Sequence, residues 1–557
     1  MYNYSIARRR FLQGSALCAG AALLPRLSPP LFAAVPSPLV NTSYGKISGA
    51  VDDGVMVFRG VPYGADTAGR RFQSPVAPVP WSGVRTATEF GPRSPQAGGR
   101  GVMGGPATIS RRGYYLPPEL GGISEDCLHL NVWTAALRDH RKRPVLFYIH
   151  GGAYSSGSAN NILYDGMRLA KRGDVVVVTI NHRLNLFGYL YLAQLSAQPE
   201  LADSGNAGML DIILALQWVR DNIAEFGGDP QRVLIFGQSG GGAKCATLMG
   251  MPAAHGLFHR VLSMSGQQIT AARPESATAR TQALLKMMEL TPARVDELRT
   301  MPMEKLVTAT HSAGYMGPVK DGHNMPRDPF DPDAPPLSSH VPMILGNAHD
   351  ETRLLIGGGD PSLFSLTWET LPEKLDVVRP FMGELKAADV VTKYRTMYPK
   401  YSATDIFFAA TTAFRSWRGE LIEAERRAVQ PITAAHTWVY QIDWRSPVDG
   451  GRFGAPHTMD IPFMFDNTAM APGMCGDDAS ALPLAHAMSS MLVAFAQTGD
   501  PNSHGKENGL PHWPVYDMKT RATMLFDNHG QKTRVENDPR GQERHLVETV
   551  AYTQPGT

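Results

Sequence analysis

The chain has 557 residues, of which 43% are hydrophobic and 19% are charged, and its formal net charge at pH 7 is +2. Such a chain can bury a large core, and it lacks the basic excess that is typical of nucleic-acid-binding proteins. Glycine (55) and proline (43) are plentiful, so we expect many loops between the elements.

The N-terminus has the pattern of an export signal. Three arginines at residues 8–10 precede Phe-Leu, a short apolar run over residues 16–24 follows, and two alanines stand at 33–34. This order is typical of a secretory signal, and the paired arginines resemble the twin-arginine type. Residues 1–34 are therefore predicted to be a cleaved signal, with the mature chain periplasmic or secreted; a disordered basic tail is the alternative. The apolar run is too short to span a membrane, and no later run is long enough.

The cysteines predict neither a disulfide framework nor a zinc site. They stand at positions 18, 127, 245 and 475, so removing the signal leaves three, at no metal-ligand spacing. A protein that folds in a reducing cytoplasm before export would not rely on disulfides.

Residues 40–90 have the pattern of short strands and turns. Residues 94–123 form a long stretch rich in glycine and proline. A loop of this length inside a compact domain is usually functional or disordered, so a flap over an active site and a floppy surface insertion both stay open.

Strand and helix patterns alternate through the rest of the chain. The ordered sheet is expected to begin near residue 124. Buried strands are predicted at residues 145–149, 175–181, 233–236, 261–266, 341–346 and 438–442, and helices at 211–226, within about 270–310, and at 484–497. This alternation favours a mainly parallel sheet with helices on both faces. No repeat or linker divides the chain, so residues 35–557 are predicted to form one large domain.

The central motif lies at residues 233–242, VLIFGQSGGG, between a buried strand and the helix-forming residues 243–249. Strand, Gly-x-Ser-x-Gly and helix form the context of a nucleophile elbow. Its sharp turn forces the apical residue, Ser239, into a strained backbone and requires small neighbours. An ordinary Gly/Ser loop is the alternative for so short a motif.

A serine nucleophile needs a base, an acid that orients the base, and backbone N–H donors for the oxyanion. Residues 150–153, His-Gly-Gly-Ala, follow a buried strand as the donor loop of α/β-hydrolases does, and the residue after the nucleophile supplies another donor. The usual chain order places an acid and then a histidine after Ser239. His457 lies in a turn-forming loop after a strand, in competition with His349, His436 and His486, and Asp350 and Glu351 both stay open as the acid.

Together these motifs resemble those of the carboxylesterase type B family of α/β-hydrolases, which includes para-nitrobenzyl esterases and cholinesterases. The resemblance spans about residues 43–530. It rests on residues 59–63 (RGVPY), 125–132 (EDCLHLNV), 150–153, 226–230 (FGGDP), 237–241, 350–351 and 454–457. It implies an α/β-hydrolase fold, with a large mostly parallel central sheet flanked by helices and with long loop and helical insertions.

The resemblance also implies roles for single residues. Ser239 matches the family's nucleophile, Glu351 its acid and His457 its base. The N–H groups of Gly152, Ala153 and Gly240 match its oxyanion donors. Arg71 and Glu125 look like its structural ion pair.

The sequence departs from the family pattern in two places. Gln238 and Gly240 flank Ser239 where the family usually has Glu and Ala. The family often pairs the cysteine that matches Cys127 with one 25 to 30 residues upstream, where this chain has Ser94. No disulfide therefore constrains the 94–123 loop, and we expect it to be a more mobile flap than in members of the family that have this disulfide.

The sequence thus predicts a serine hydrolase that cleaves small carboxylic esters through an acyl-enzyme, without a metal or cofactor. An amide or carbamate hydrolase with the same triad is one alternative. A non-catalytic cholinesterase-like binding protein is another, against which the intact Ser239, Glu351 and His457 argue. Substrate contacts are predicted for Tyr154 and Gln267, and also for Phe187, Met264 and Phe330, with ordinary packing as the alternative for each.

Overall fold

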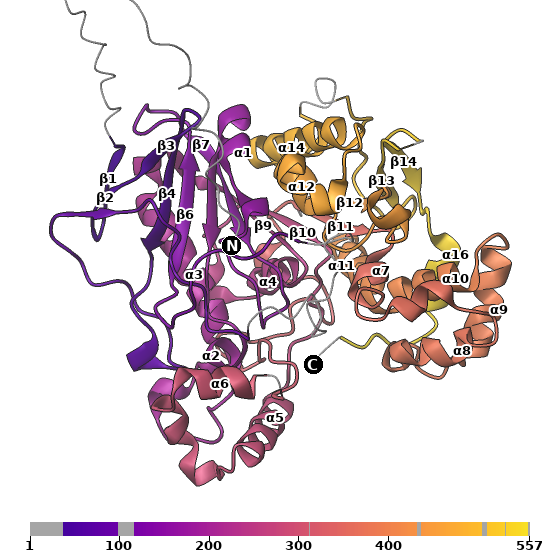
Figure 1. Cartoon of the computed structure of the whole chain (residues 1–557), viewed down its shortest axis with the longest axis horizontal. Helices are drawn as coiled ribbons and strands as arrows, with labels where there is room; N and C mark the ends of the chain where they lie inside the picture. The colour runs from indigo at the N-terminus through magenta and orange to yellow at the C-terminus, as the bar shows by residue number, and fades with distance from the viewer. Residues whose placement is uncertain are drawn as a thin grey trace, which may run out of the picture. The chain divides into compact units, whose positions relative to one another are not determined.

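An eleven-stranded sheet runs through the computed structural model (Figure 1), in the order β14-β13-β12-β11-β10-β9-β7-β8-β6-β4-β3. Its strands are β3 (Ala50–Asp52), β4 (Val55–Pro62), β6 (His129–Thr134), β7 (Arg143–Ile149), β8 (Val176–Ile180), β9 (Gly228–Gln238), β10 (Arg260–Met264), β11 (Met343–Ala348), β12 (Thr437–Ile442), β13 (Ala522–Phe526) and β14 (Arg534–Asn537). A small separate sheet joins β1 (Leu39–Thr42), β2 (Gly45–Ser48) and β5 (Val84–Thr86).

The structure describes residues 37–97, 116–310, 312–431, 436–503, 509–529 and 531–554. By their contacts, Pro38–Thr557 form one compact unit. The predicted signal at residues 1–34 and most of the predicted flap at 94–123 lie outside the described residues.

The strands from β8 to β13 form a parallel block at the middle of the sheet. Every residue of β7 and of β8 is buried, as expected of parallel strands covered on both faces. The pairings toward β3 and at β14 are antiparallel. The predicted α/β-hydrolase fold with a large, mostly parallel sheet is therefore confirmed.

The expectation that the sheet begins near residue 124 is wrong. β3 and β4 precede that position and join the sheet because β4 pairs with β6. These two strands are partly exposed and lack the continuous apolar run that marks the central strands, so their sequence pattern did not assign them to the sheet.

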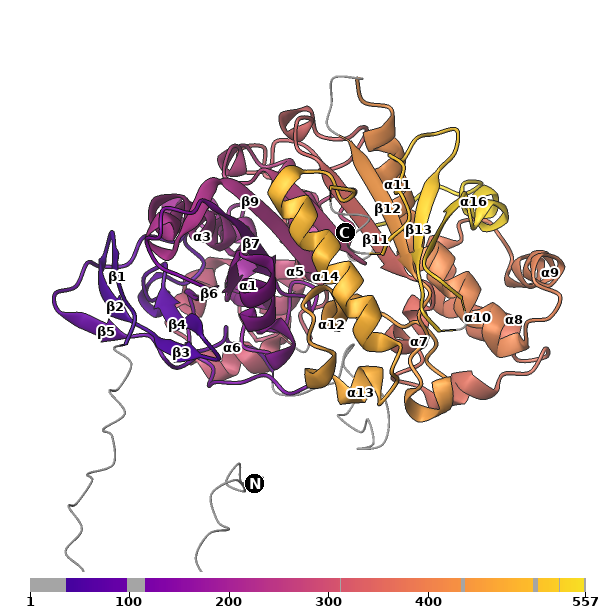
Figure 2. The ribbon, with the colours of Figure 1, turned by 90° about the horizontal axis from the view of Figure 1, so that it is seen from above.

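Helices cover both faces of the sheet. On β7, the side chains of Leu146 and Tyr148 belong to one core, and those of Val145 and Phe147 to the other. α1 (Met167–Gly173), α12 (Asp460–Met464) and α14 (Ala481–Thr498) lie on the first side, as Figure 2 shows for α1 and α14. α3 (Ala207–Asn222) and α4 (Gly240–Met249) pack on the second side, and α11 (Arg418–Ala428) packs against β11 and β12.

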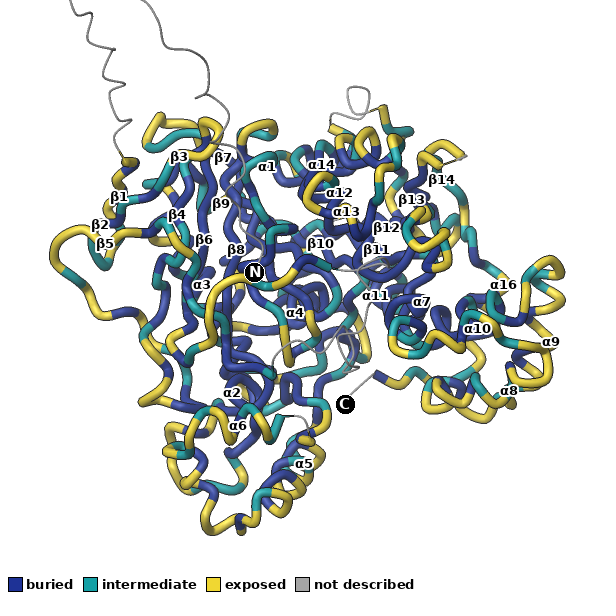
Figure 3. The backbone as a smooth tube through the Cα atoms, in the orientation of Figure 1, coloured by how far each residue is buried: buried dark blue, intermediate teal, exposed yellow. Residues whose placement is uncertain are grey.

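Two helical insertions extend from this core. One holds α5 (Pro274–Met287) and α6 (Met303–Ala309), and the other holds α8 (Leu371–Lys374), α9 (Ala387–Met397) and α10 (Ala403–Thr411), which share a separate apolar cluster with α16 (Gly541–Val547). Figure 3 shows the contrast between the buried strands and the exposed outer surfaces of α5 and α9. The other α-helices of the described residues are α2 (Asn185–Tyr189), α7 (Glu351–Leu355) and α13 (Pro472–Cys475).

Two residue-level predictions are met within the described chain. Arg71 pairs with Glu125, its Nε donating to Oε2 at 2.6 Å. Cys127 is a free, buried thiol, and Cys245 and Cys475 are likewise free and buried. None of the helices described combines the length and apolar character that a bilayer crossing needs.

Candidate active site

Ser239 stands between the end of β9 and the start of α4. Its backbone has φ 58° and ψ −125°, a conformation that costs a non-glycine residue free energy and marks a strained turn. Glycine is required around it, since a Cβ at Gly241 would lie 2.0 Å from the carbonyl oxygen of Ile149. The predicted strand, tight turn and helix are thus all present, and α4 packs directly against the end of β7.

His457 and Glu351 meet in the buried interior next to this turn. Nδ1 of His457 hydrogen-bonds Oε2 of Glu351, and both side chains are almost fully buried. The other carboxylate oxygen, Oε1, accepts a hydrogen bond from the N–H of Ala348 at 2.7 Å and from the hydroxyl of Ser265 at 2.6 Å. Both oxygens of Glu351 are therefore engaged, which fixes the orientation of the carboxylate and of the imidazole.

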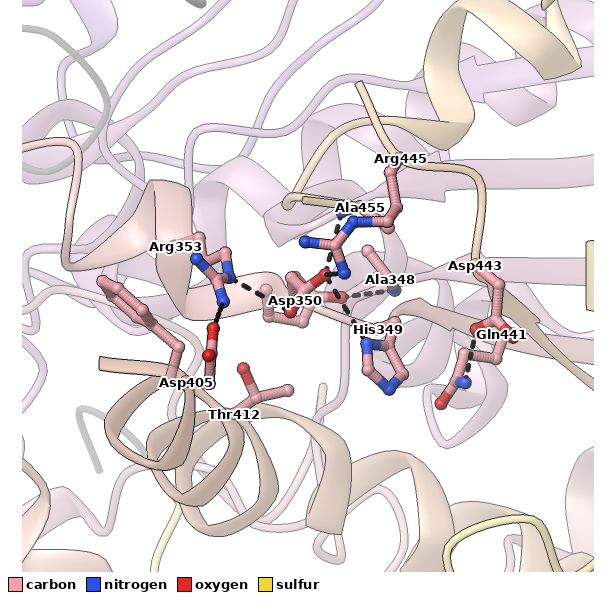
Figure 4. Close-up of polar contacts among 12 residues, drawn as sticks. Ala348, His349, Asp350, Arg353, Asp405, Thr412, Gln441, Asp443, Arg445 and Ala455 are labelled. Carbon is pink, nitrogen blue, oxygen red and sulfur yellow. Dashed lines mark hydrogen bonds and ion pairs between the residues drawn. The ribbon is translucent and has the colours of Figure 1, made fainter. Parts of the chain in front are cut away.

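Asp350 has a different set of partners (Figure 4). Its Oδ2 accepts from the N–H of Ala455 at 3.0 Å, and its Oδ1 accepts from Nε of Arg353 at 3.2 Å. Burial by itself raises the pKa of Asp350, but the charges of His349, Arg353 and Arg445 more than offset it and hold that pKa well below its usual range. Of the two acids that the residues left open, Asp350 thus anchors the backbone two residues before His457, and Glu351 contacts the imidazole.

Gln238 also reaches His457. Its amide Nε2 lies 3.2 Å from Nε2 and 3.4 Å from Nδ1 of the imidazole. The N–H of Ser239 donates to the carbonyl of Met264 at 2.7 Å. Within the described chain, no hydrogen bond joins the hydroxyl of Ser239 to His457. In hydrolases without a bound substrate, the hydrogen bond between nucleophile and base is often long and shortens only when the substrate binds.

Residues 150–153 form a loop, called here the 150–153 loop, that packs against the start of α4. Gly152 and Ala153 have positive φ, 89° and 53°, so this loop turns sharply after β7. A Cβ at Gly240 would lie 2.2 Å from the carbonyl oxygen of Ala153. The N–H groups of Gly152 and Ala153 donate to no acceptor in the part of the chain that the structure describes.

Comparisons with known proteins fit this geometry. The sequence profile described as "Carboxylesterase family" matches residues 36–546. The chain belongs to the carboxylesterase family. It is 32% identical to the para-nitrobenzyl esterase of Bacillus subtilis (91% of this chain, 98% of the relative). It is 31% identical to the phenmedipham hydrolase of Pseudarthrobacter oxydans (88% and 96%). A solved carboxylesterase of Geobacillus stearothermophilus superposes with a TM-score of 0.77 at 35% identity (91% and 99%).

This membership makes the chain a carboxylic ester hydrolase. An enzyme is thereby favoured over the non-catalytic binding protein that the sequence left open. The family assignment also agrees with the eleven-stranded mixed sheet and its flanking helices.

Two further buried carboxyl groups of this carboxylesterase interact electrostatically with Glu351. Burial, and then the charge of Glu351, raise the pKa of Asp460 to about 7, and its Oδ2 accepts from the hydroxyl of Tyr440 at 2.9 Å. Burial and then Glu351 also raise the pKa of Glu420 on α11. A neighbouring negative charge disfavours ionisation of a carboxyl group, so Asp460 and Glu420 take up a proton more readily than an exposed carboxyl does. On the same helix, burial raises the pKa of Glu423 to about 8.

Sequence reasoning missed Ser265, Asp460 and Glu420. Asp460 follows His457 by three residues, a spacing that could have drawn attention to it. Ser265 carries a weaker signal: it directly follows β10, the strand next to β9. Glu420 lies within a helix of mixed composition, and no local pattern marks it.

The predicted substrate contacts lie in different surroundings. Tyr154 is buried, and its hydroxyl donates to Oε1 of Gln268 at 2.9 Å. Gln267 is partly buried beside Gly419. Phe187, Met264 and Phe330 are all buried in the core.

One group of residues in the described chain has metal-ligand composition. The side chains of Asp203, Asp321 and His323 have ligand atoms within 4.8 Å of one another. Hydrogen bonds account for this cluster, since His323 contacts Asp203 at 2.7 Å and Asn324 donates to both aspartates. The hydrogen bond to Asp203 raises the pKa of His323, so we treat the group as a surface ion-pair network.

Proposed function

We propose that this carboxylesterase uses Ser239 as the nucleophile, His457 as the general base and Glu351 as the acid that orients the base. The observation that most supports this assignment is the buried contact between His457 Nδ1 and Glu351 Oε2 beside the strained turn at Ser239. A buried carboxylate on Nδ1 fixes the tautomer in which Nε2 carries no proton and can accept one.

In the proposed reaction, His457 takes the proton of the Ser239 hydroxyl as its oxygen attacks the ester carbonyl. The oxyanion is bound by the N–H groups of Gly152, Ala153 and Gly240, of which the first two have no acceptor in the described chain. His457 then protonates the leaving alcohol. Water hydrolyses the acyl-enzyme by the same steps, and Ser239 is restored.

Kinetics of single variants test the nucleophile. Ser239→Ala is expected to lower kcat by about 10⁵-fold or more with an unchanged melting temperature. Mass spectrometry after treatment with an organophosphate should find the label on Ser239. Wild-type turnover by Ser239→Ala would falsify the assignment.

A matched pair of histidine variants tests the base. His457→Ala is expected to abolish turnover, whereas His436→Ala, at an exposed histidine that also follows Ser239 in the chain, should keep it. Equal activity of the two variants would refute the role of His457.

Hydrolysis of a carbamate or amide by the same residues is the second candidate. It is loosely favoured by the 31% identity to a relative named phenmedipham hydrolase. A panel of matched ester, carbamate and anilide substrates with one acyl group distinguishes them. A higher kcat/KM for the carbamate than for the ester would favour the second candidate.

Export through residues 1–34 is also part of the proposal. It is supported by the arginine pair and the apolar run of the sequence. The test compares the mature mass and the cell fraction of the wild type with those of a variant in which Arg8 and Arg9 are both replaced by Lys. Unchanged processing of that variant would argue against a twin-arginine signal.

A further inference from the structure

Lys244 is a fully buried lysine on the second turn of α4. Its Nζ donates to the carbonyl oxygen of Ala153 at 2.6 Å and lies 3.4 Å from that of His150. It also lies 5.0 Å from the centre of the Tyr154 ring. Among the described residues no carboxylate forms an ion pair with it, so the amine is satisfied by the 150–153 loop alone.

Burial of an amine without a counterion is costly. Replacing buried ionic groups by apolar side chains of similar volume is often neutral or stabilising, so stability alone does not account for Lys244. Burial lowers the pKa of Lys244 to about 7. Two buried histidines, His150 and His182, stack beside it with ring centres 4.6 Å apart, and burial and then neighbouring positive charges lower the pKa of both. The burial of the Lys244 amine without a counterion therefore requires an explanation other than stability.

Gly240 also lies close to the carbonyl group of Ala153. It precedes Lys244 by four residues, one turn along α4, so the two lie on the same side of the helix. The Cβ that an alanine would have at Gly240 falls 2.2 Å from the oxygen of Ala153. The missing methyl group therefore lets the carbonyl approach the helix, and the amine of Lys244 holds it there.

We propose that Lys244 is a positioning residue that, together with Gly240, docks the 150–153 loop onto α4 and so fixes the spacing of the oxyanion donors. The two carbonyls that Lys244 contacts belong to residues 150 and 153, and the N–H groups of Gly152 and Ala153 lie between them. The inference rests on the proposed function, because it assumes that these N–H groups and that of Gly240 bind the oxyanion.

This role predicts a specific kinetic signature. Donors that are displaced bind the transition state less well and leave ground-state binding almost unchanged. Lys244→Met should lower kcat about 10- to 100-fold and change KM by less than about 2-fold. A trifluoromethyl ketone, which forms a tetrahedral adduct with the nucleophile, should lose affinity by about the same factor as kcat. The melting temperature should stay level or rise, which a merely structural role does not predict.

The experiment measures kcat, KM, ketone inhibition and melting temperature for Lys244→Met. Lys286→Met, at an exposed lysine on α5, is the matched control and should equal the wild type. Gly240→Ala serves as the second variant, and it should lower kcat because its methyl group displaces Ala153. In the Lys244→Met background the same substitution should cost less, because the released loop can shift.

Three results would overturn the proposal: an unchanged kcat in Lys244→Met, a loss of kcat matched by a lower melting temperature, or strict additivity of the two substitutions. If Lys244→Met does not fold, a wild-type kcat in Gly240→Ala overturns it. The Ser239→Ala variant separates this failure from that of the proposed function. An active Ser239→Ala refutes the nucleophile, whereas an inactive Ser239→Ala beside a fully active Lys244→Met refutes only the docking role.

Discussion

The 150–153 loop and the segment of residues 349–351 flank the site on opposite sides, and they differ in composition. The loop meets α4 through backbone carbonyls, glycines and one amine that has no carboxylate partner in the described chain. In the acidic segment, Arg353 and Arg445 form ion pairs with Asp350, and the imidazole of His457 hydrogen-bonds Glu351.

The difference follows from what each side has to provide. Backbone N–H groups can surround an oxyanion only where side chains are absent, so the loop side tolerates little added volume. A carboxylate that orients an imidazole has to stay ionised while it is buried, so the acidic side needs donors and positive charges. Substitutions that change charge should therefore act on one side, and substitutions that change volume on the other.

The largest effect is expected from removing charge at Glu351. Glu351→Gln should lower kcat/KM by about 10³- to 10⁴-fold, because the amide can favour the wrong imidazole tautomer. Steady-state kinetics with circular dichroism as the check on folding measure this. Near-normal turnover in Glu351→Gln, together with a crippled Asp350→Asn, would assign the acid to the wrong neighbour.

Asp350→Asn should act on stability. Its loss leaves Arg353 and Arg445 without this partner, so unfolding should become easier by about 3 kcal/mol. The pKa of Asp350 is held below its unfolded value of about 3.9, so its contribution is full above about pH 4 and is lost as the pH falls further. Melting temperatures of wild type and variant at pH 6 and pH 3 measure it. A difference that grows toward pH 3 would contradict the sign.

Added volume on the loop side is tested at Gly241. Its Cβ would lie 2.0 Å from the carbonyl of Ile149, so Gly241→Ala should destabilise the protein by about 1–3 kcal/mol and lower kcat. Gly250→Ala at the other end of α4 is the control, since its φ is −96° and its nearest contact is 3.4 Å. Equal melting temperatures of the two variants would show that the close approach at Gly241 is not tight.

The smallest effect is expected from placing a charge on the loop side of His457. In Gln238→Glu, a carboxylate would replace the amide that lies 3.2 Å from Nε2 of His457. It should stabilise the protonated imidazole and move the acidic limb of the kcat/KM profile to higher pH by about 1 unit. A profile that does not move, or moves to lower pH, would show that the side chain at position 238 does not interact electrostatically with the imidazole of His457.

The elements of the core followed from local patterns, whereas the contacts between distant segments did not. The apolar run at 233–236 and the motif after it correctly located β9, the turn and α4, because strand and elbow are encoded within a few residues. The choice of Glu351 over Asp350 needed the resemblance, since adjacent acids look alike in sequence. Ser265 reaches Glu351 only because β10 and β11 pair.

The contacts of Lys244 could likewise not be predicted from the local sequence. In the sequence it is one residue of a helix-forming stretch, and its buried position depends on how closely the 150–153 loop approaches α4. Partly exposed strands such as β4 were also missed as members of the main sheet, because their apolar residues are interrupted.

The buried groups around the site make folding an exchange of protons. Asp460 and Glu423, with pKa values of about 7 and 8, are ionised in the unfolded chain at pH 5–6 and take up protons as they are buried. His150, whose pKa falls to about 3, and His182 release theirs on folding in the same range. The carboxyls disfavour the native state as the pH rises and the histidines disfavour it as the pH falls. Near pH 5–6 the carboxyls and the histidines therefore act on the folding equilibrium in opposite directions.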